Sequence, residues 1–322
     1  MLGAQPVGAI DCGTNSFRLL VASRGAEGEL VEHTRRLRIV RLGQGVDASG
    51  RLHPDALERT FAAAEEYAEA LAAYGVEPQR RRVVATSAAR DARNVEDFFA
   101  GMQARLGVRP EVVSGEEEAR LSFVGAVSGL GSGSGVGSDA AASIGDRGSM
   151  LVMDIGGGST ELVLGHRSGR IERSVSLDIG SVRLAERFGL IGPWTSAVRA
   201  EAEAYVDGLL DGLGWPLAAV GGWIGVAGTV TTMSALAQGL TAYDRSLVHG
   251  STLAVADVTI LADRLTALTS GEIGALGVPP GRADVIAAGA LIADRLARRV
   301  GRPMRVSETD ILDGIALGLL TP

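Results

Sequence analysis

The sequence predicts an α/β protein with two domains, and three observations favour this fold class. The chain has 322 residues, which is enough for two hydrophobic cores of ordinary size. Apolar segments of strand length alternate with longer segments of helical periodicity, as in proteins whose helices pack on sheets. A short motif that contains an aspartate and glycines occurs twice, once at the start of each half.

The first half is expected to form a mixed sheet covered by helices. Its opening strand-like segments are separated by turns, and the first long helix is expected to stop at Gly75, because glycine ends helices readily. The expected strands are 7–11, 16–24, 31–43, the start of 80–92 and 110–114, and the expected helices are 53–75, 94–107 and a third that begins at Ser114.

A glycine- and serine-rich tract at 128–149 interrupts this pattern. Such a composition is typical of a flexible linker or an exposed loop. We therefore expect an N-terminal domain at 1–127 and a C-terminal domain at 150–322, with the last helix as a candidate to pack back on the first domain. The second half is expected to contain a strand at 222–228 and helices at 196–213, 229–240, 255–268, 282–300 and 309–320.

The charge and the residue types exclude several classes of protein. The formal net charge is −7, which argues against a nucleic-acid partner. The chain contains no lysine, whereas a Walker phosphate loop, a protein kinase and a Schiff-base enzyme each require one. Cys12 is the only cysteine, so a cysteine-rich zinc site is excluded, and we expect Cys12 to be a small buried hydrophobic residue. No charged leader and no apolar run of about 18 residues is present, so we expect a cytoplasmic protein without a membrane partner.

The repeated motif places a carboxylate and a glycine turn at the end of an apolar strand. Asp11 precedes Gly13, and Asp154 precedes three consecutive glycines at 156–158. Glycines let backbone N–H groups approach an anion closely, although a plain hairpin would explain them equally well. The repetition favours two loops that grip a phosphate chain and hold a divalent cation between them.

Three carboxylates are candidates to serve that cation. Asp154 and Glu161 flank the second glycine turn, and Mg²⁺ prefers carboxylate and phosphate oxygens. Asp11 is expected to hydrogen-bond a water molecule in the outer shell of the metal. The alternative for Glu161 is a solvated strand residue.

The helix that begins near Ser114 carries three consecutive glutamates. Ser114 and Glu117 have the spacing of a capping box, and Glu116 lies four residues before Arg120, which favours an ion pair. Glu118 has neither explanation, and a carboxylate at a helix start beside a domain boundary is placed to activate water. The alternative for Glu118 is an ordinary surface glutamate.

Arginines supply the remaining candidates. Arg90 and Arg93 follow a strand and small residues, a position that suits phosphate binding because a planar guanidinium can contact two oxygens. The alternative for each is an arginine on a helix surface. The basic segment 35–41 and the run 80–82 are expected to be solvated strand ends rather than a groove for a long polyanion.

Six segments together resemble the exopolyphosphatase and guanosine pentaphosphate phosphohydrolase (Ppx/GppA) family of the actin-like ATPase superfamily. They are AIDCGTNSFRLLVA, ATSAARDARN, SGEEEARL, LVMDIGGGSTELVLG, SLDIGSVRLAERF and GVAGTVTTM, in this order along nearly the whole chain. The resemblance implies two actin-like, ribonuclease H-like domains that face each other across a cleft. It also implies Mg²⁺-dependent hydrolysis of the terminal phosphate of inorganic polyphosphate, with Mn²⁺ as the alternative metal.

The resemblance also implies roles for individual residues. Glu118, immediately before Ala-Arg, resembles the catalytic base, and Arg90 resembles the arginine that contacts phosphate. Asp154 and Glu161 resemble the metal-linked acids. The residues that match the substrate-binding loops are Asn15, Ser16, Gly156, Gly157, Gly158, Ser159, Gly180 and Ser181.

Two departures make the chain similar to the short, two-domain branch of this family. The additional helical C-terminal region of longer members is absent from the sequence. Ile311-Leu312-Asp313-Gly314 stands where longer members have a Leu-Arg-Glu-Gly motif, so a phosphate or partner contact made by that arginine is not expected here.

The resulting prediction is an exopolyphosphatase, a hydrolase of phosphorus-containing acid anhydrides that releases orthophosphate. The alternatives are hydrolysis of the 5′-terminal phosphate of guanosine pentaphosphate (pppGpp) and a non-catalytic nucleotide-binding regulatory module. The expected partners are inorganic polyphosphate and, for the first alternative, pppGpp or ppGpp. Homodimerisation is an expectation from the resemblance alone.

Overall fold

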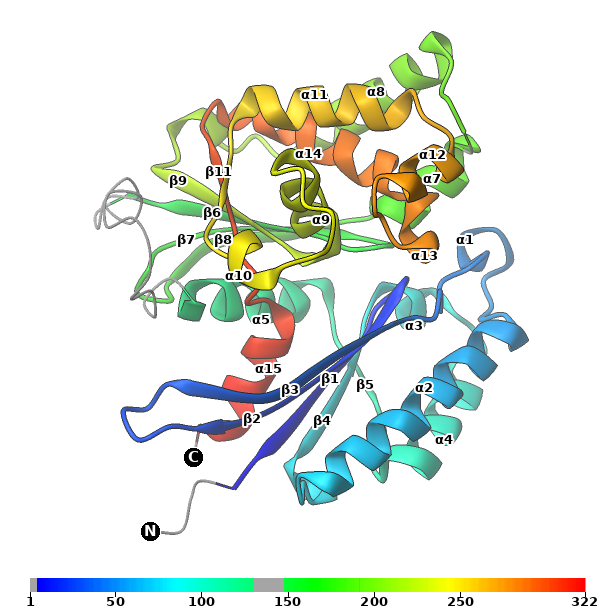
Figure 1. Ribbon diagram of the computed structural model, residues 1–322, viewed down its shortest axis with the longest axis vertical. Coiled ribbons are helices and arrows are strands. Elements are labelled where there is room, and N and C mark those ends of the chain that lie inside the picture. The colour runs from blue at the N-terminus through cyan, green and yellow to red at the C-terminus, as the bar shows by residue number, and fades with distance from the viewer. Residues whose placement is uncertain (1–4, 130–147, 191, 322) are drawn as a thin grey trace. The chain divides into compact units, whose positions relative to one another are not determined.

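The computed structural model describes residues 5–129, 148–190 and 192–321, so most of the tract predicted to be a linker lies outside the described residues. The chain divides into two compact units (Figure 1). Unit 1 comprises Met1–Ser128 and Thr309–Pro322, and unit 2 comprises Gly129–Glu308. Within the described part of the chain, no helix has the length and the hydropathy needed to span a membrane.

The sheet of unit 1 is an antiparallel meander extended by two parallel strands. Its order is β3-β2-β1-β4-β5, with β4 parallel to both β1 and β5. Every residue of β1 is buried, and alternation sends Ile10 to one face of the sheet and Ala9 to the other. The strands are β1 Val7–Cys12, β2 Ser16–Arg24, β3 Leu30–Ile39, β4 Arg81–Ala85 and β5 Glu111–Val112.

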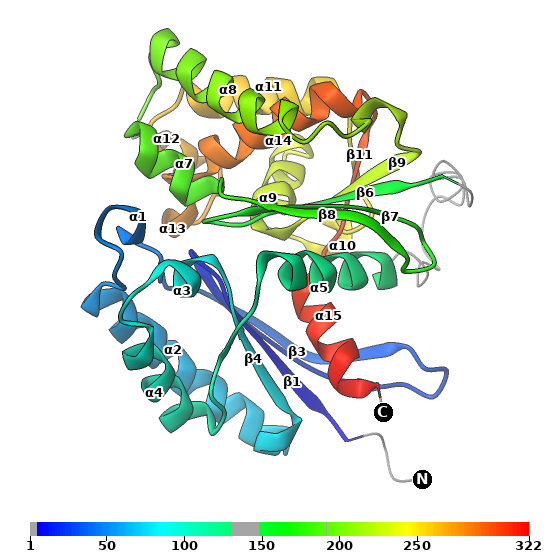
Figure 2. The same cartoon turned by 180° about the vertical axis from the view of Figure 1, so that it is seen from behind.

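Helices cover both faces of this sheet (Figures 1 and 2). On one face, α2 (Pro54–Ala73) and α4 (Val95–Leu106) enclose a core that includes Phe17 and Tyr67. On the other face, α5 (Gly115–Ser128) and α15 (Ile311–Leu320) pack against each other, and α15 packs against β1. The short helices of unit 1 are α1 Val46–Ser49, η1 Pro78–Arg80 and α3 Ser87–Asp91.

The sheet of unit 2 contains the same order of five strands and one more strand at its edge. The order is β10-β11-β9-β6-β7-β8, in which β6, β7 and β8 form the antiparallel meander and β9 is parallel to β6. The strands are β6 Met150–Ile155, β7 Thr160–Gly165, β8 Ile171–Leu177, β9 Gly222–Val226, β10 Thr252–Leu253 and β11 Met304–Val306.

A helical layer covers one face of this second sheet and carries most of the core of unit 2 (Figure 2). The buried helix α14 contributes Ile286, Leu291 and Leu296 to that core. The helices are α7 Ser181–Phe188, α8 Ser196–Asp211, η3 Leu217–Ala219, α9 Ala227–Ala237, α10 Arg245–Val248, α11 Val255–Thr266, α12 Ser270–Ala275, α13 Pro280–Ala283 and α14 Ile286–Val300.

The strands β10 and β11 were not predicted, because strands of two and three residues show no period.

The two copies of the repeated motif occupy equivalent places in the two sheets. In unit 1, Asp11 of β1 is paired in register with Arg18 of β2. In unit 2, Asp154 of β6 is paired in register with Glu161 of β7. Each unit therefore presents one motif at the carboxyl end of its first strand.

Candidate active site

The first loop joins β1 to β2 and is closed by its own backbone. The N–H of Gly13 donates to the carbonyl of Ser16 at 2.9 Å. The carbonyl of Asn15 accepts the N–H of Arg41 at 2.9 Å, and the side chains of Thr14 and Asn15 are buried. The loop carbonyls are thus satisfied by the segment that follows β3. This arrangement places Asn15 and Ser16, the two predicted substrate contacts of unit 1, on one short rigid turn.

The second loop has the same closing bond and a different support. The N–H of Gly156 donates to the carbonyl of Ser159 at 3.0 Å. The carbonyls of Gly156 and Gly157 accept the N–H groups of Ser181 and Val182 at 3.0 and 2.8 Å, respectively. These bonds dock the loop carbonyls onto the first turn of α7. Among the described residues, the N–H groups of Gly157 and Gly158 have no hydrogen-bond acceptor, so an anion could accept from both.

Gly180 supports this second loop by its lack of a side chain. A Cβ at Gly180 would overlap the carbonyl of Gly157 and would lie 2.7 Å from the nitrogen of Gly158. Ser181 adds a hydrogen bond from its Oγ to the carbonyl of Gly156 at 3.3 Å. Gly180 and Ser181 therefore hold the glycine loop in place, and their predicted contact with substrate remains a prediction.

Asp154 and Glu161 bring two buried carboxylates side by side. They are partners in the antiparallel ladder, and their residues are only 6% and 1% exposed. Ser176, the partner of Glu161 on β8, donates its hydroxyl to Glu161 Oε1 at 2.7 Å. Like charges on directly opposed residues destabilise a sheet, and burial increases that cost. A divalent cation would remove this repulsion, so the pair fits a metal that has carboxylate ligands.

Asp11 has a different partner from the one that its expected role required. Arg18 donates from Nε and Nη2 to Asp11 Oδ2 at 2.9 and 2.7 Å. Burial raises the pKa of Asp11, and the charge of Arg18 only partly opposes this effect. The described residues contain no group of three or more His, Cys, Asp or Glu side chains arranged to hold a metal ion. The expected outer-shell role of Asp11 therefore stays a prediction.

Glu118 and Arg90, the predicted base and phosphate ligand, form one ion pair in unit 1. Arg90 Nη1 donates to Glu118 Oε2 at 2.8 Å and to the carbonyl of Val113 at 3.0 Å. Glu118 is 8% exposed, so it is not the ordinary surface glutamate of the alternative interpretation. No partner for Glu118 could be predicted from local sequence, because Arg90 lies 28 positions away in the chain.

The partners predicted for the two neighbouring glutamates were partly wrong. Arg120 binds the carboxylate of Glu117 at 2.7 and 2.8 Å, whereas an ion pair with Glu116 was expected. Spacings of three and four residues both face each other on a helix, so sequence alone does not choose between them. The N–H of Glu117 donates to Ser114 Oγ at 3.2 Å, as the predicted cap requires. The hydrogen bond from Arg120 lowers the pKa of Glu117.

Two further expectations concern buried polar groups in unit 1. Cys12 is 1% exposed, and burial raises the pKa of its thiol well above the ordinary value, which agrees with a buried structural role. The expectation that Arg35 is solvated was wrong, because its Nη2 donates to Asp313 Oδ1 at 2.8 Å and its side chain is only 17% exposed. Asp313, the partner of Arg35, belongs to α15 and lies 278 positions away in the sequence.

Sequence reasoning did not single out Arg18, although a signal for it existed. The residue opposite the aspartate stands seven positions later in both copies, at Arg18 after Asp11 and at Glu161 after Asp154. Comparing the copies at that spacing would have found an arginine in one and a glutamate in the other.

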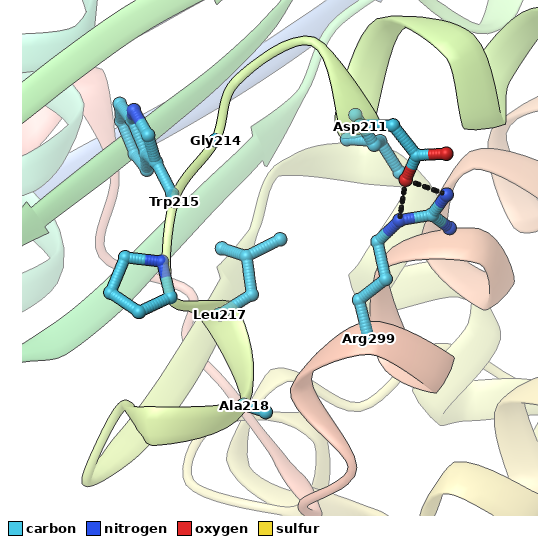
Figure 3. Close-up of a pocket in the computed structure, with 8 residues that line it drawn as sticks. Asp211, Gly214, Trp215, Leu217, Ala218 and Arg299 are labelled. Atoms are coloured by element: carbon cyan, nitrogen blue, oxygen red, sulfur yellow. Dashed lines mark hydrogen bonds and ion pairs between the residues drawn. The ribbon is translucent and has the colours of Figure 1, made fainter.

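A cavity of about 370 Å³ lies elsewhere in unit 2 and includes none of the candidate residues. Figure 3 shows Arg299 turned toward Asp211, with Trp215 on a different wall of the pocket. The lining loop precedes Gly222, which pairs with Met150 at the start of β6, whereas Asp154 lies near the opposite end of that strand. This cavity is therefore separate from the candidate active site.

Comparison with known proteins gives consistent relatives along the whole chain. The model of the Ppx/GppA phosphatase family matches residues 20–321. Exopolyphosphatase 2 of Mycobacterium tuberculosis is 46% identical over 97% of this chain and 98% of its own.

Solved structures agree with this relationship. An exopolyphosphatase-like protein has a TM-score of 0.87 and 39% identity, and the match covers 98% of this chain and 97% of that one. A Ppx/GppA family member from Aquifex aeolicus has a TM-score of 0.79 and 30% identity, with 98% and 97% covered. The α/β fold class with two actin-like sheets, predicted from the sequence, is confirmed by these similarities.

Proposed function

The chain belongs to the Ppx/GppA phosphatase family, and from this membership we infer that it is an exopolyphosphatase that releases orthophosphate from the end of inorganic polyphosphate. The observation that carries this inference is the second loop. It combines a buried pair of carboxylates, Asp154 and Glu161, with two backbone N–H groups, of Gly157 and Gly158, that can bind an anion. In a complex of polyphosphate with a metal ion, the cation matches the two carboxylates and the phosphate anion matches the two N–H groups.

Phosphatases of this family generally depend on a divalent metal ion. We propose Mg²⁺, with Mn²⁺ as the alternative, held by Asp154 and Glu161. Mg²⁺ commonly uses one or two carboxylates and completes its shell with phosphate oxygens and water, so a cluster of three protein acids is not needed. When bound, the metal neutralises negative charge on the phosphate that is transferred. We propose that Asp11 hydrogen-bonds a water molecule in the outer shell of the metal ion.

Glu118 is proposed to be the general base. A water molecule attacks the terminal phosphorus, its proton passes to the Glu118 carboxylate, and the bond from phosphorus to the bridging oxygen breaks. Orthophosphate leaves, and the remaining polyphosphate is one unit shorter. Arg90 holds the Glu118 carboxylate at 2.8 Å, and we propose that its remaining guanidinium nitrogens contact phosphate oxygens.

The phosphate chain is proposed to bind through the two glycine loops. In unit 2, Gly157, Gly158 and Ser159 supply N–H and hydroxyl donors, with Gly156 closing the turn. In unit 1, Asn15 and Ser16 supply the corresponding donors. Because the chain has no lysine, arginines and backbone amides must provide the positive potential that lysine gives in other phosphate sites.

The cytoplasm is the proposed location, and inorganic polyphosphate is the proposed partner. Homodimerisation and the binding of pppGpp or ppGpp remain predictions.

Phosphate release by purified protein tests the proposal. Polyphosphate, pppGpp and ATP are supplied side by side, each with Mg²⁺ and with excess chelator. We expect release from polyphosphate that requires the metal and is lost in Asp154→Asn. Preferred release from pppGpp would show the alternative substrate, and full activity in chelator would contradict the metal site.

A further inference from the structure

A cluster of buried charges lies at the start of α15, outside the proposed catalytic groups. Asp310 and Asp313 form a capping box in which Asp310 Oδ1 accepts the N–H of Leu312 at 3.0 Å and Asp313 Oδ2 accepts the N–H of Asp310 at 2.8 Å. Each carboxylate uses one oxygen for the cap. The other oxygen of each is turned toward the sheet of unit 1.

Those two oxygens bind arginines on β2 and β3. Arg18 Nη1 donates to Asp310 Oδ2, and Arg35 Nη2 donates to Asp313 Oδ1 at 2.8 Å. Of these two arginines, Arg18 also binds Asp11, through Nε at 2.9 Å and Nη2 at 2.7 Å. One planar guanidinium therefore joins the first residue of the capping box to the aspartate of the repeated motif.

Burial makes this link stiff. Asp11 is 3% exposed and Asp310 is 5% exposed, while the side chain of Arg18 is 14% exposed. In such surroundings solvent does not compete for the hydrogen bonds, and loss of one partner leaves the other charge buried and unpaired. Asp11 thus has an orientation that Arg18 dictates.

The backbone fixes Asp310 in turn. The carbonyl of Asp310 lies so close to Gly125 of α5 that a Cβ on Gly125 would overlap it. One turn later, a Cβ on Gly314 would overlap the carbonyl of Leu121 on the same helix. The first turn of α15 therefore touches the backbone of α5 twice, and Asp310 cannot shift unless the two helices move apart.

We propose that Arg18 and Asp310 are positioning residues that hold Asp11 in the orientation required for phosphate release. This inference rests on the proposed function. Asp11 borders the first loop, since its Oδ2 would lie 3.9 Å from a Cβ on Gly13, and Ser16 Oγ would lie at the same distance from that Cβ. The first turn of α15 thereby sets the geometry of the loop that carries Asn15 and Ser16.

Arg18→Lys and Arg35→Lys form a matched pair that tests this role, because Arg35 also pairs with Asp310, at 3.9 Å from Nη1 to Oδ1, whereas it is Arg18 that binds Asp11. Lysine retains the positive charge, but a single ammonium cannot reproduce the fork that holds two carboxylates. Mutations of groups that orient a ligand typically cost about 10- to 100-fold in activity. We expect Arg18→Lys to lower kcat by such a factor with KM within about twofold, and Arg35→Lys to stay within about threefold of wild type. Equal losses in the two variants would overturn the proposal.

A double-mutant cycle with Asp11→Asn separates positioning from general destabilisation. If Arg18 acts through Asp11, Arg18→Lys should cause little further loss of kcat in the Asp11→Asn background. If both losses multiply, Arg18 acts by another route and the proposal is wrong. Amide hydrogen exchange at residues 12–16 gives a readout without catalysis, and it should accelerate in Arg18→Lys and not in Arg35→Lys.

A second pair moves Asp310 without altering any charge. Gly314→Ala should force α15 away from Leu121 and reproduce the fall in kcat, whereas a Cβ at Gly318 on the same helix meets nothing within 4 Å, so Gly318→Ala should leave kcat unchanged. If Gly314→Ala does not fold, Asp310→Asn, which retains a capping side chain, carries the same expectation. Unchanged kcat in Gly314→Ala or its replacement would overturn the proposal.

The experiments distinguish failure of this inference from failure of the proposed function. A wild-type protein that releases no phosphate from polyphosphate would contradict the function, and the exchange measurement would still decide whether Arg18 orders the first loop. An active wild type with identical exchange in Arg18→Lys and Arg35→Lys would contradict the positioning role alone.

Discussion

In unit 1, Asp11 of β1 faces Arg18 of β2, whereas in unit 2 Asp154 of β6 faces Glu161 of β7. The strands, the register and the closing bond of the loop are equivalent, so the backbone does not distinguish the copies. The charge opposite the aspartate does. In the first pair an arginine faces the aspartate, and in the second pair a second carboxylate faces it, which is why we propose the cation at the second pair.

The supports of the two loops differ as well. In unit 1, the N–H of Gly43 donates to the carbonyl of Thr14 at 2.8 Å, and a Cβ on Gly43 would meet the Thr14 methyl group. In unit 2, a Cβ on Gly180 would meet the backbone of Gly157 and Gly158. The Thr14 methyl group can rotate away from an added Cβ, whereas the backbone of the tight turn at Gly157 and Gly158 cannot. The comparison indicates that the second loop is the less adaptable of the two.

The largest expected effect concerns Glu118, the proposed base, which belongs to unit 1. Glu118→Gln retains the shape of the side chain and removes the proposed base, so kcat should fall by about 10²- to 10⁴-fold with KM nearly unchanged. Steady-state kinetics with polyphosphate measure both values. Glu116→Gln and Glu117→Gln are the controls and should stay within a few-fold of wild type. A change mainly in KM for Glu118→Gln would place the base elsewhere.

The next effect tests the charge difference between the copies. Asp154→Asn and Glu161→Gln should each lower the metal-dependent rate by roughly 10²- to 10³-fold, because a metal ion supplies several kcal/mol of charge stabilisation. Thermal unfolding provides a second readout: Mg²⁺ should raise the Tm of wild type and should not raise that of Glu161→Gln.

The exposed Glu201 on α8 provides a control for that experiment. Glu201→Gln should keep both the rate and the rise in Tm. If Mg²⁺ stabilises Glu161→Gln as much as wild type, the metal does not bind at this pair.

A smaller effect distinguishes the two loop supports. Gly180→Ala should reduce kcat/KM by about tenfold and the free energy of unfolding by about 1–3 kcal/mol, as overpacking against fixed backbone does. Gly43→Ala should cost less than Gly180→Ala, roughly 1 kcal/mol, because the Thr14 methyl group can rotate away and the next atoms, Thr14 Cβ and Ala88 Cβ, lie at 3.2 Å. Urea unfolding and steady-state kinetics measure the free energy of unfolding and kcat/KM of both variants. A larger loss of stability in Gly43→Ala than in Gly180→Ala would contradict the expected difference between the two loop supports.

The smallest effect is a difference in acid response between the units. Burial alone would raise the pKa of Asp207 in unit 2, but hydrogen bonds from Arg295 and Arg299 outweigh burial and lower it. A lowered pKa contributes stability above the unfolded value of 3.8 that is lost as the pH falls through the folded value. The destabilisation caused by Asp207→Asn should therefore shrink as the pH falls from about 7 to about 3.

Asp11 in unit 1 should respond with the opposite sign. Its pKa is raised by burial, so its contribution is present below the unfolded value and is lost as the pH rises through the folded value. The stability of wild type relative to Asp11→Asn should increase as the pH falls. Urea unfolding at several pH values measures both trends, and parallel trends in the two variants would contradict the assignment.

Much of the fold could be read from local pattern. The predicted helix 53–75 corresponds to α2 at Pro54–Ala73, and the predicted strand 16–24 corresponds to β2 at Ser16–Arg24. In both segments the period of the apolar residues is regular over many positions, and turn residues mark the ends. The short strands β10 and β11 have no such period, so only their neighbours in the sheet define them.

The candidate site likewise has features that local sequence predicts and features that depend on the folded chain. The two aspartate-glycine loops could be predicted from the sequence alone, because a turn, a carboxylate and a strand end are local features. Glu118 could be selected because it had no local partner. The partners depend on tertiary contacts: Arg90 pairs with Glu118, Arg120 pairs with Glu117 and not Glu116, and Asp310 pairs with Arg18 across 292 positions of the chain. Ion pairs form where folded elements bring opposite charges close together in space. The separation of two residues along the chain does not predict that proximity.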